Sequence, residues 1–315
     1  MNDPETKIIR DLEVITAPSA LGLRPPAPGK TPGVRRMASR LIDAGLLDGV
    51  PLAKRVDLPE PVYTFEPDAT TGIRNLPALV DFTLLLERAV SASLQAGRVP
   101  VILGGDCSVL LGPALALRKL GHHTLIHLDG HNDFGHEGKS SKPYATIAGA
   151  DLAVVTGRGP EALTNLSGLK PYFRDEDVIQ LGEKANGDTT DYWSEDFLRT
   201  TIRRHPFVDI RRIGIESMMR MVTDELDRAA TAGFWLHLDL DVLDPELLPA
   251  VDSPDPTGLS WQELDVALNH LVRHRRLLGL NVGIYDPDLD SDGQYANKIA
   301  ALLRQHLLIL AGRGS

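Results

Sequence analysis

The sequence predicts an α/β protein built on a mostly parallel β-sheet whose two faces are both covered by helices. Short, almost continuously apolar segments alternate along the chain with segments of helical periodicity, and this alternation is typical of parallel sheets buried on both sides. Polar and acidic residues follow four of the apolar segments, at the strand ends where such sheets carry their functional groups. A hydrophobic content of 43% and a charged content of 24% over 315 residues indicate a globular chain with a sizeable core.

Seven apolar segments are expected to be short, buried strands. They comprise residues 11–15, 99–103, 125–128, 178–181, 211–215, 234–240 and 277–285. Between them, a helix is expected over residues 31–45 and another over residues 79–97, since proline starts the first and glycine ends both. Ser260 and Glu263 form a capping-box pattern, and residues 296–312 have the apolar spacing of a last helix ended by glycine.

The composition limits the classes of function that the chain can have. A formal net charge of -10 argues against a nucleic-acid partner, because phosphate binding needs a basic surface. The single cysteine, Cys107, excludes an intramolecular disulfide and fits a reducing compartment. The N-terminal residues lack the apolar region of a signal peptide, and no stretch is long enough for a membrane helix. We therefore expect a cytoplasmic protein with no membrane partner.

No long linker, internal repeat or low-complexity segment divides the sequence. The proline-rich stretch at residues 25–32 lies too near the start to separate two folded units. We therefore expect residues 1–315 to form one domain, with about residues 1–10 as a flexible N-terminus.

Acidic residues gather at the ends of the expected strands. The sequences concerned are GGDCS at 104–108, HLDGHND at 127–133, HLDLDVLDP at 237–245 and IYDPDLD at 284–290. Residues two apart in an extended chain share a face, so Asp129, His131 and Asp133 should lie together, as should Asp239 and Asp241. Each aspartate alone is explained as well by a turn or a helix cap. Together they would repel one another unless cations lie between them, and bridging carboxylates suggest two ions of the manganese type.

Three of these motifs resemble the signatures of the ureohydrolase superfamily, which contains arginase, agmatinase and formiminoglutamase. GGDCS, DGHND and DLDVLDP stand where that superfamily usually has GGDHS, DAHxD and DxDxxDP, in the same order and at similar spacing, and the likeness covers about residues 12–310. The resemblance implies a three-layer α/β/α fold and a binuclear manganese centre whose bridging hydroxide attacks a guanidinium or related carbon. It also implies a small-molecule substrate and a homo-oligomer, commonly a trimer or hexamer.

The resemblance assigns six metal ligands by position: Asp129 and Asp239 bridging both ions, Asp133 with Cys107 on one ion, and His131 with Asp241 on the other. It also favours Asp133 as the first holder of the proton that the leaving amine needs. Histidine is usual at the position of Cys107. A thiolate there would favour zinc, iron or nickel over manganese, whereas a thiol turned into the core would be only a small residue after a Gly-Gly turn.

Two further departures concern the substrate. Ile284 falls where arginases place a glutamate against the guanidinium, so the cationic anchor is lost and a less basic substrate is expected. Asp286 or Asp288 from a shifted loop could replace that carboxylate, and Asn132 is the other expected substrate contact. The histidine that some arginases use as a proton shuttle falls at Ala148, and His136 is the nearest imidazole, expected to be either the shuttle or an exposed loop residue.

These observations predict a metal-dependent hydrolase of a linear C–N bond in an amidine-like compound, such as a hydroxyguanidine, a formimino compound or a guanidino acid. Two alternatives remain at this point: a catalytically silent relative that binds metal or ligand, and a single-zinc amide hydrolase of the deacetylase type. Residues 288–299 open like an EF-hand loop, but Ile299 replaces the bidentate glutamate. That segment is therefore expected to form a turn and a helix cap.

Overall fold

The computed structural model describes residues 10–135, 146–184 and 196–313. Its centre is an eight-stranded sheet in the order β2-β1-β3-β8-β7-β4-β5-β6, in which every pair of neighbouring strands is parallel. The strands are β1 (Leu12–Thr16), β2 (Leu52–Asp57), β3 (Val99–Leu103), β4 (Thr124–Leu128), β5 (Val178–Leu181), β6 (Arg203–His205), β7 (Phe234–Asp239) and β8 (Leu277–Gly283). The predicted parallel sheet is confirmed.

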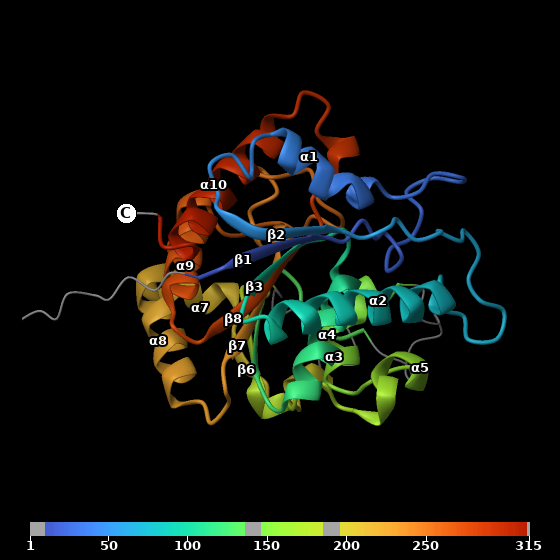
Figure 1. Ribbon diagram of the computed structural model, residues 1–315, viewed down its shortest axis with the longest axis horizontal. Helices are drawn as coiled ribbons and strands as arrows, with labels where there is room; N and C mark the ends of the chain where they lie inside the picture. Colours follow the sequence, from blue (N-terminus) through green and yellow to red (C-terminus); the bar gives the residue numbers. More distant parts are fainter. Residues whose placement is uncertain (1–9, 136–145, 185–195, 314–315) are drawn as a thin grey trace, which may run out of the picture.

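Helices cover both faces of this sheet (Figure 1). The α-helices are α1 (Met37–Asp43), α2 (Leu76–Gln95), α3 (Leu111–Leu120), α4 (Asp151–Val155), α5 (Glu161–Thr164), α7 (Phe207–Ile213), α8 (Ile215–Arg228), α9 (Trp261–Arg273) and α10 (Gln294–Leu310). Short 3-10 turns are η1 (Gly33–Arg36), η2 (Cys107–Leu110), η3 (Ala148–Ala150), η4 (Leu166–Gly168), η5 (Asp175–Asp177), η6 (Leu240–Val242) and η7 (Pro287–Leu289). The three-layer α/β/α arrangement expected from the sequence is thereby confirmed.

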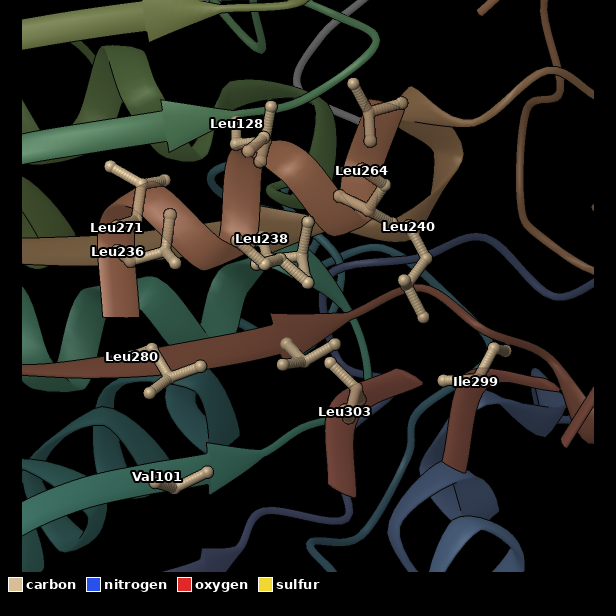
Figure 2. Packing of buried hydrophobic residues seen from close by; sticks show 14 of the residues in the cluster. Val101, Leu128, Leu236, Leu238, Leu240, Leu264, Leu271, Leu280, Ile299 and Leu303 are labelled. Carbon is tan, nitrogen blue, oxygen red and sulfur yellow. The ribbon is translucent and has the colours of Figure 1, made fainter. Parts of the chain in front are cut away.

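The alternation of side chains along the strands divides the core into two clusters. On one face, Leu236 and Leu238 of β7 lie in one buried cluster with Leu264 and Leu271 of α9 (Figure 2), and α1, α8 and α10 contribute to the same cluster. On the other face, residues such as Trp235 pack with α2, α3 and α4. Because the apolar strands are buried on both sides, they read as near-continuous hydrophobic runs.

Six of the seven expected strands are present, but the strand expected at residues 211–215 is wrong. This short apolar stretch joins two helices, α7 and α8, and Gly214 between them has a φ of 82°. Periodicity alone cannot separate so short a run from a helix end. The edge strands β2 and β6 were not expected, because their sequences LAKRVD and RRH are largely polar.

The expected helix boundaries are confirmed where capping residues predicted them. Ser260 accepts a hydrogen bond from the backbone N–H of Glu263, whose carboxylate accepts from the N–H of Ser260, completing the capping box of α9. Gly45, Gly97 and Gly312 follow α1, α2 and α10 with φ values of 85°, 70° and 71°, conformations that favour glycine. Among the described residues, no helix combines the length and apolar character needed to cross a membrane.

Candidate metal centre

The predicted site residues lie at the carboxyl ends of neighbouring strands in the middle of the sheet. In the order β3-β8-β7-β4, β3 leads into Cys107 at the start of η2, β7 ends in Asp239, and β4 is followed at once by Asp129. Parallel strands end on the same side, so residues far apart in the sequence meet there.

Asp129 and Asp239 adopt the same local geometry on adjacent strands. Oδ1 of Asp129 accepts the backbone N–H of His131 at 2.6 Å, and Oδ1 of Asp239 accepts the backbone N–H of Asp241 at 2.7 Å. Each turn therefore uses one carboxylate oxygen and leaves the other directed into the site. Oδ2 of Asp129 is buried and has no hydrogen-bond partner among the described residues, whereas Oδ2 of Asp239 accepts from the Cys107 thiol at 2.7 Å.

His131 and Asp241 form the outer part of the group. Nδ1 of His131 lies 2.8 Å from Oδ2 of Asp241, while the backbone N–H of Gly130 donates to Oδ1 of that carboxylate at 3.1 Å. Burial lowers the pKa of His131, but attraction to Asp241 outweighs it and raises the pKa to about 10. Ligand atoms of Asp129, His131 and Asp241 all lie within 4.8 Å of one another, which is close enough to hold one cation.

Asp133 lines the cavity beside these groups and has a φ of 41°. Burial raises its pKa well above the ordinary value, and repulsion from Asp129 and Asp151 adds to this. Burial and repulsion from Asp241 and Asp129 likewise raise the pKa of Asp239. Carboxylates in such positions are destabilised when ionised unless a positive charge lies among them, so the donor set fits divalent cations.

Cys107 is 3% exposed, and its sulfur points at the carboxylate of Asp239. Burial raises the pKa of its thiol well above the ordinary value, and Asp239 adds to the rise. The sequence left open whether this side chain faces the site, and the geometry places it there. Whether it binds a metal stays a prediction.

Asp129, Asp133, Asp239 and Asp241 are called the acidic group below. Three of them, Asp133, Asp239 and Asp241, line a cavity of about 430 Å³. Its walls and mouth are lined by Leu23, Arg24, Pro25, Pro26, Thr146, Ala148, Gly149, Asp252, Ser253 and Ile284. Among the described residues that line it, Arg24 is the one guanidinium or ammonium group. Ile284 is a buried apolar residue of this wall.

The two residues expected to contact substrate have other partners. Asn132 donates to Glu183 at 2.8 Å and accepts the backbone N–H of Phe134 at 3.1 Å. Asp286 accepts the backbone N–H of Gly33 at 3.2 Å and that of Asp288 at 2.8 Å. The structure brings neither to the lining of the cavity, and a substrate contact from either one stays a prediction. His136 lies outside the described residues.

Three buried residues next to the site were not found from the sequence. They are His127, Asp151 and His237, each with no solvent exposure. A signal for the two histidines was present: His-Leu-Asp begins both HLDGHND and HLDLDVLDP, so the two-residue alternation extends one step into each strand. No local pattern marks Asp151, which the fold alone brings near β4.

The fold and this arrangement of acidic residues define an α/β protein with a candidate metal centre, and comparison with known proteins identifies the family. The arginase family model matches residues 28–309. An arginase of Staphylococcus aureus strain MSSA476 is 28% identical over 300 residues, 93% of this chain and 95% of the relative. An arginase of Brevibacillus brevis is 31% identical over 235 residues, 74% and 77% of the two chains.

A solved structure supports the same conclusion at the level of the fold. The native arginase of Bacillus caldovelox at pH 5.6 superposes with a TM-score of 0.82 at 26% identity, covering 94% of this chain and 97% of that one. The chain therefore belongs to the arginase family.

Proposed function

We propose that this protein hydrolyses a linear C–N bond of an amidine or guanidino compound with the help of two divalent cations. The observation that carries the proposal is the grouping of Asp129, His131 and Asp241 within reach of one cation. His131 and Asp241 also line a cavity together with Asp133 and Asp239. Members of the arginase family hydrolyse C–N bonds, which supports the same general reaction here.

The residues present fit a pair of cations. Asp129 offers a buried oxygen that has no hydrogen-bond partner within residues 10–135, 146–184 and 196–313. Asp239 lies beside it on the neighbouring strand, so these two carboxylates would be shared between the cations. Carboxylates and imidazole suit Mn²⁺, Zn²⁺, Fe²⁺ or Ni²⁺, with Mn²⁺ favoured by the excess of oxygen ligands. Such ions, when bound, lower the pKa of water and provide hydroxide at neutral pH.

Asp133 is the proposed proton carrier of the reaction. Burial and repulsion from Asp129 and Asp151 raise its pKa above the ordinary value in the metal-free protein, and it lines the cavity where we place the scissile bond. It takes the proton released by the attacking water and gives it to the nitrogen of the departing amine, which must be protonated to leave. The C–N bond breaks as that N–H bond forms.

The cavity also favours a class of substrate. Ile284 offers no negative charge to a guanidinium, whereas the exposed Arg24 at the mouth can pair with a carboxylate. A compound with a weakly basic or neutral amidine-like head and an acidic tail therefore fits best. Guanidino acids, N-hydroxyguanidino acids and formimino amino acids meet this description.

A compound screen tests the proposal. The manganese-loaded protein should release urea or ammonia from at least one of these acids, and an otherwise identical amine lacking the carboxylate should react at least tenfold more slowly. The Asp133→Asn variant should lose most of the activity. If two ions bind and none of the compounds reacts, the protein is a silent relative; one bound zinc per chain would instead favour the deacetylase-like alternative.

A further inference from the structure

A row of four polar side chains crosses the sheet directly below the acidic group. His127 of β4 is in register with His237 of β7, Gln180 of β5 is the next partner of His127, and Asn281 of β8 is the next partner of His237. All four are completely buried, in strands that are otherwise apolar. Buried polar groups without partners are costly, so such a row needs a physical reason.

Asp151, at the start of α4, lies against the two histidines. Nε2 of His127 is 3.3 Å from Oδ1 of Asp151 and 3.6 Å from Oδ2 of Asp129, while Nε2 of His237 is 3.7 Å and 3.8 Å from Oδ2 of Asp129 and Asp151. The Oδ2 atoms of both aspartates are buried and have no hydrogen-bond partners in the part of the chain that the structure describes. Nε2 of His127 and Oδ1 of Asp151 form a long hydrogen bond, and the other separations exceed hydrogen-bond lengths. All of them match neighbouring ligands around one ion, which lie about 3.4 Å apart when each bond is about 2.1 Å.

A hydrogen-bond chain decides which histidine can bind a metal. Nε1 of Trp235, which can only donate, donates to Oδ1 of Asn281 at 2.7 Å. The amide of Asn281 therefore directs Nδ2 at Nδ1 of His237, 2.7 Å away. Neutral His237 must then carry its proton on Nε2, the atom that faces Asp129 and Asp151. This tautomer can donate to the carboxylates but cannot serve as a ligand through Nε2.

His127 is under no such restriction. Its Nδ1 has no hydrogen-bond partner among the described residues, so the ring can carry its proton there and offer Nε2 to a cation. Ligand atoms of His127, Asp133 and Asp151 all lie within 4.8 Å of one another. Cys107 shares a comparable group only with His237 and Asp239 in the described part of the chain, and the tautomer of His237 removes one of those three donors.

We propose that one of the two cations is held by His127, Asp133 and Asp151, with Asp129 beside them, and that Cys107 is not its ligand. The imidazole missing at the position of Cys107 is thus replaced by one from the interior of β4. His237 holds the unpaired oxygens of Asp129 and Asp151 in place by facing them with its N–H. The assignment rests on the proposed binuclear centre, which the second ion completes at His131 and Asp241.

Metal content measured without substrate tests the assignment separately from catalysis. Wild-type protein and the variants His127→Gln, Asp151→Asn, Cys107→Ser and His306→Gln are stripped with chelator, reloaded with Mn²⁺ and analysed for ions per chain. His306 is a matched control, a buried histidine paired with Asp265. We expect about two ions in the wild type, Cys107→Ser and His306→Gln, but about one in His127→Gln and Asp151→Asn.

We call the cation site at His127, Asp133 and Asp151 the inner site. The opposite pattern, in which Cys107→Ser loses a bound ion and His127→Gln loses none, overturns the inner site. A wild type that binds one ion, lost on changing His127, supports the inner site while contradicting the binuclear function; no bound ion contradicts both. Two measurements need no variant to fold. The Co²⁺ form should lack a sulfur-to-cobalt charge-transfer band, and anomalous scattering from Mn²⁺-soaked crystals should place an ion against Nε2 of His127. An ion bonded to Sγ of Cys107 would refute the assignment.

Discussion

Ile284 lines the cavity with an apolar side chain and an uncommon backbone conformation. Its φ of 78° is rare for a β-branched residue, and its backbone N–H donates to the carbonyl of Gly105 at 2.8 Å, which ties the end of β8 to the end of β3. The fold thus holds an apolar side chain in a strained conformation beside the acidic group. The sequence motifs predict that arginases have a carboxylate at this position, and this alignment stays a prediction.

Replacing Ile284 by Glu should therefore change which substrates are accepted. A carboxylate there gains a charge-assisted hydrogen bond of about 1.5–3 kcal/mol with a cationic guanidinium, so kcat/KM for arginine-like compounds should rise about ten- to a hundredfold. The matched variant Ile284→Gln has the same length without the charge and should give little gain. Steady-state kinetics on cationic and neutral substrates provide the comparison, and equal gains in both variants would refute the electrostatic explanation.

At the scale of single elements, Asp290 fixes the start of α10. It accepts from the hydroxyl of Tyr285 at 2.6 Å and from the backbone N–H groups of Ala296 and Tyr295 at 2.8 Å and 3.3 Å. Burial raises the pKa of Asp290, but these hydrogen bonds outweigh it, so the pKa lies below the ordinary value. The structure shows a turn and the start of a helix in this segment, with Asp290 accepting from N–H groups of the first helical turn.

The Asp290→Ala variant should lose about 2 kcal/mol of unfolding free energy at pH 7. Because the folded pKa is lowered, this stabilisation is present above the unfolded pKa of about 4 and is lost as the pH falls below it. The difference between wild type and variant should therefore shrink in acid. Asp292 accepts a hydrogen bond from the backbone N–H of Gln294, so Asp292→Ala should lower the unfolding free energy clearly less than Asp290→Ala in the same denaturation series. An equal loss in the two variants would contradict the role of Asp290.

Elements that carry an apolar run or a capping pattern could be predicted from the sequence, and the others could not. Strands such as β4 and β7 are buried on both faces and therefore show in composition, whereas the polar edge strands β2 and β6 owe their pairing to neighbours. The same limit applies to the site. Asp129 and Asp239 stand in recognisable motifs, but Asp151 reaches His127 only because α4 packs over β4, a contact that no local pattern contains.

At the scale of the whole molecule, the parallel sheet gathers negative charge that opposes folding. Five aspartates converge on one edge of the sheet, namely Asp129, Asp133, Asp151, Asp239 and Asp241, in a chain of net charge -10. The pKa values of Asp133 and Asp239 are raised well above the ordinary value by burial first and repulsion second. Ionising these groups in the folded protein therefore costs free energy that the unfolded chain does not lose.

This imbalance predicts how stability depends on pH and metal. A carboxyl with a raised folded pKa binds more protons in the folded state, so stability of the metal-free protein should fall as the pH rises from about 5 toward 8. Mn²⁺ at a hundred times its Kd should add about 2.7 kcal/mol per ion. For a chain of this length that raises Tm by about 4 °C per ion, with the larger gain at the higher pH. Melting curves in chelator and in Mn²⁺ measure both effects.

Asp239→Asn should flatten the dependence of the metal-free Tm on pH, whereas Asp224→Asn on the exposed side of α8 should not. A metal-free Tm that rises with pH over this interval would show that the acidic group is not the source of the instability.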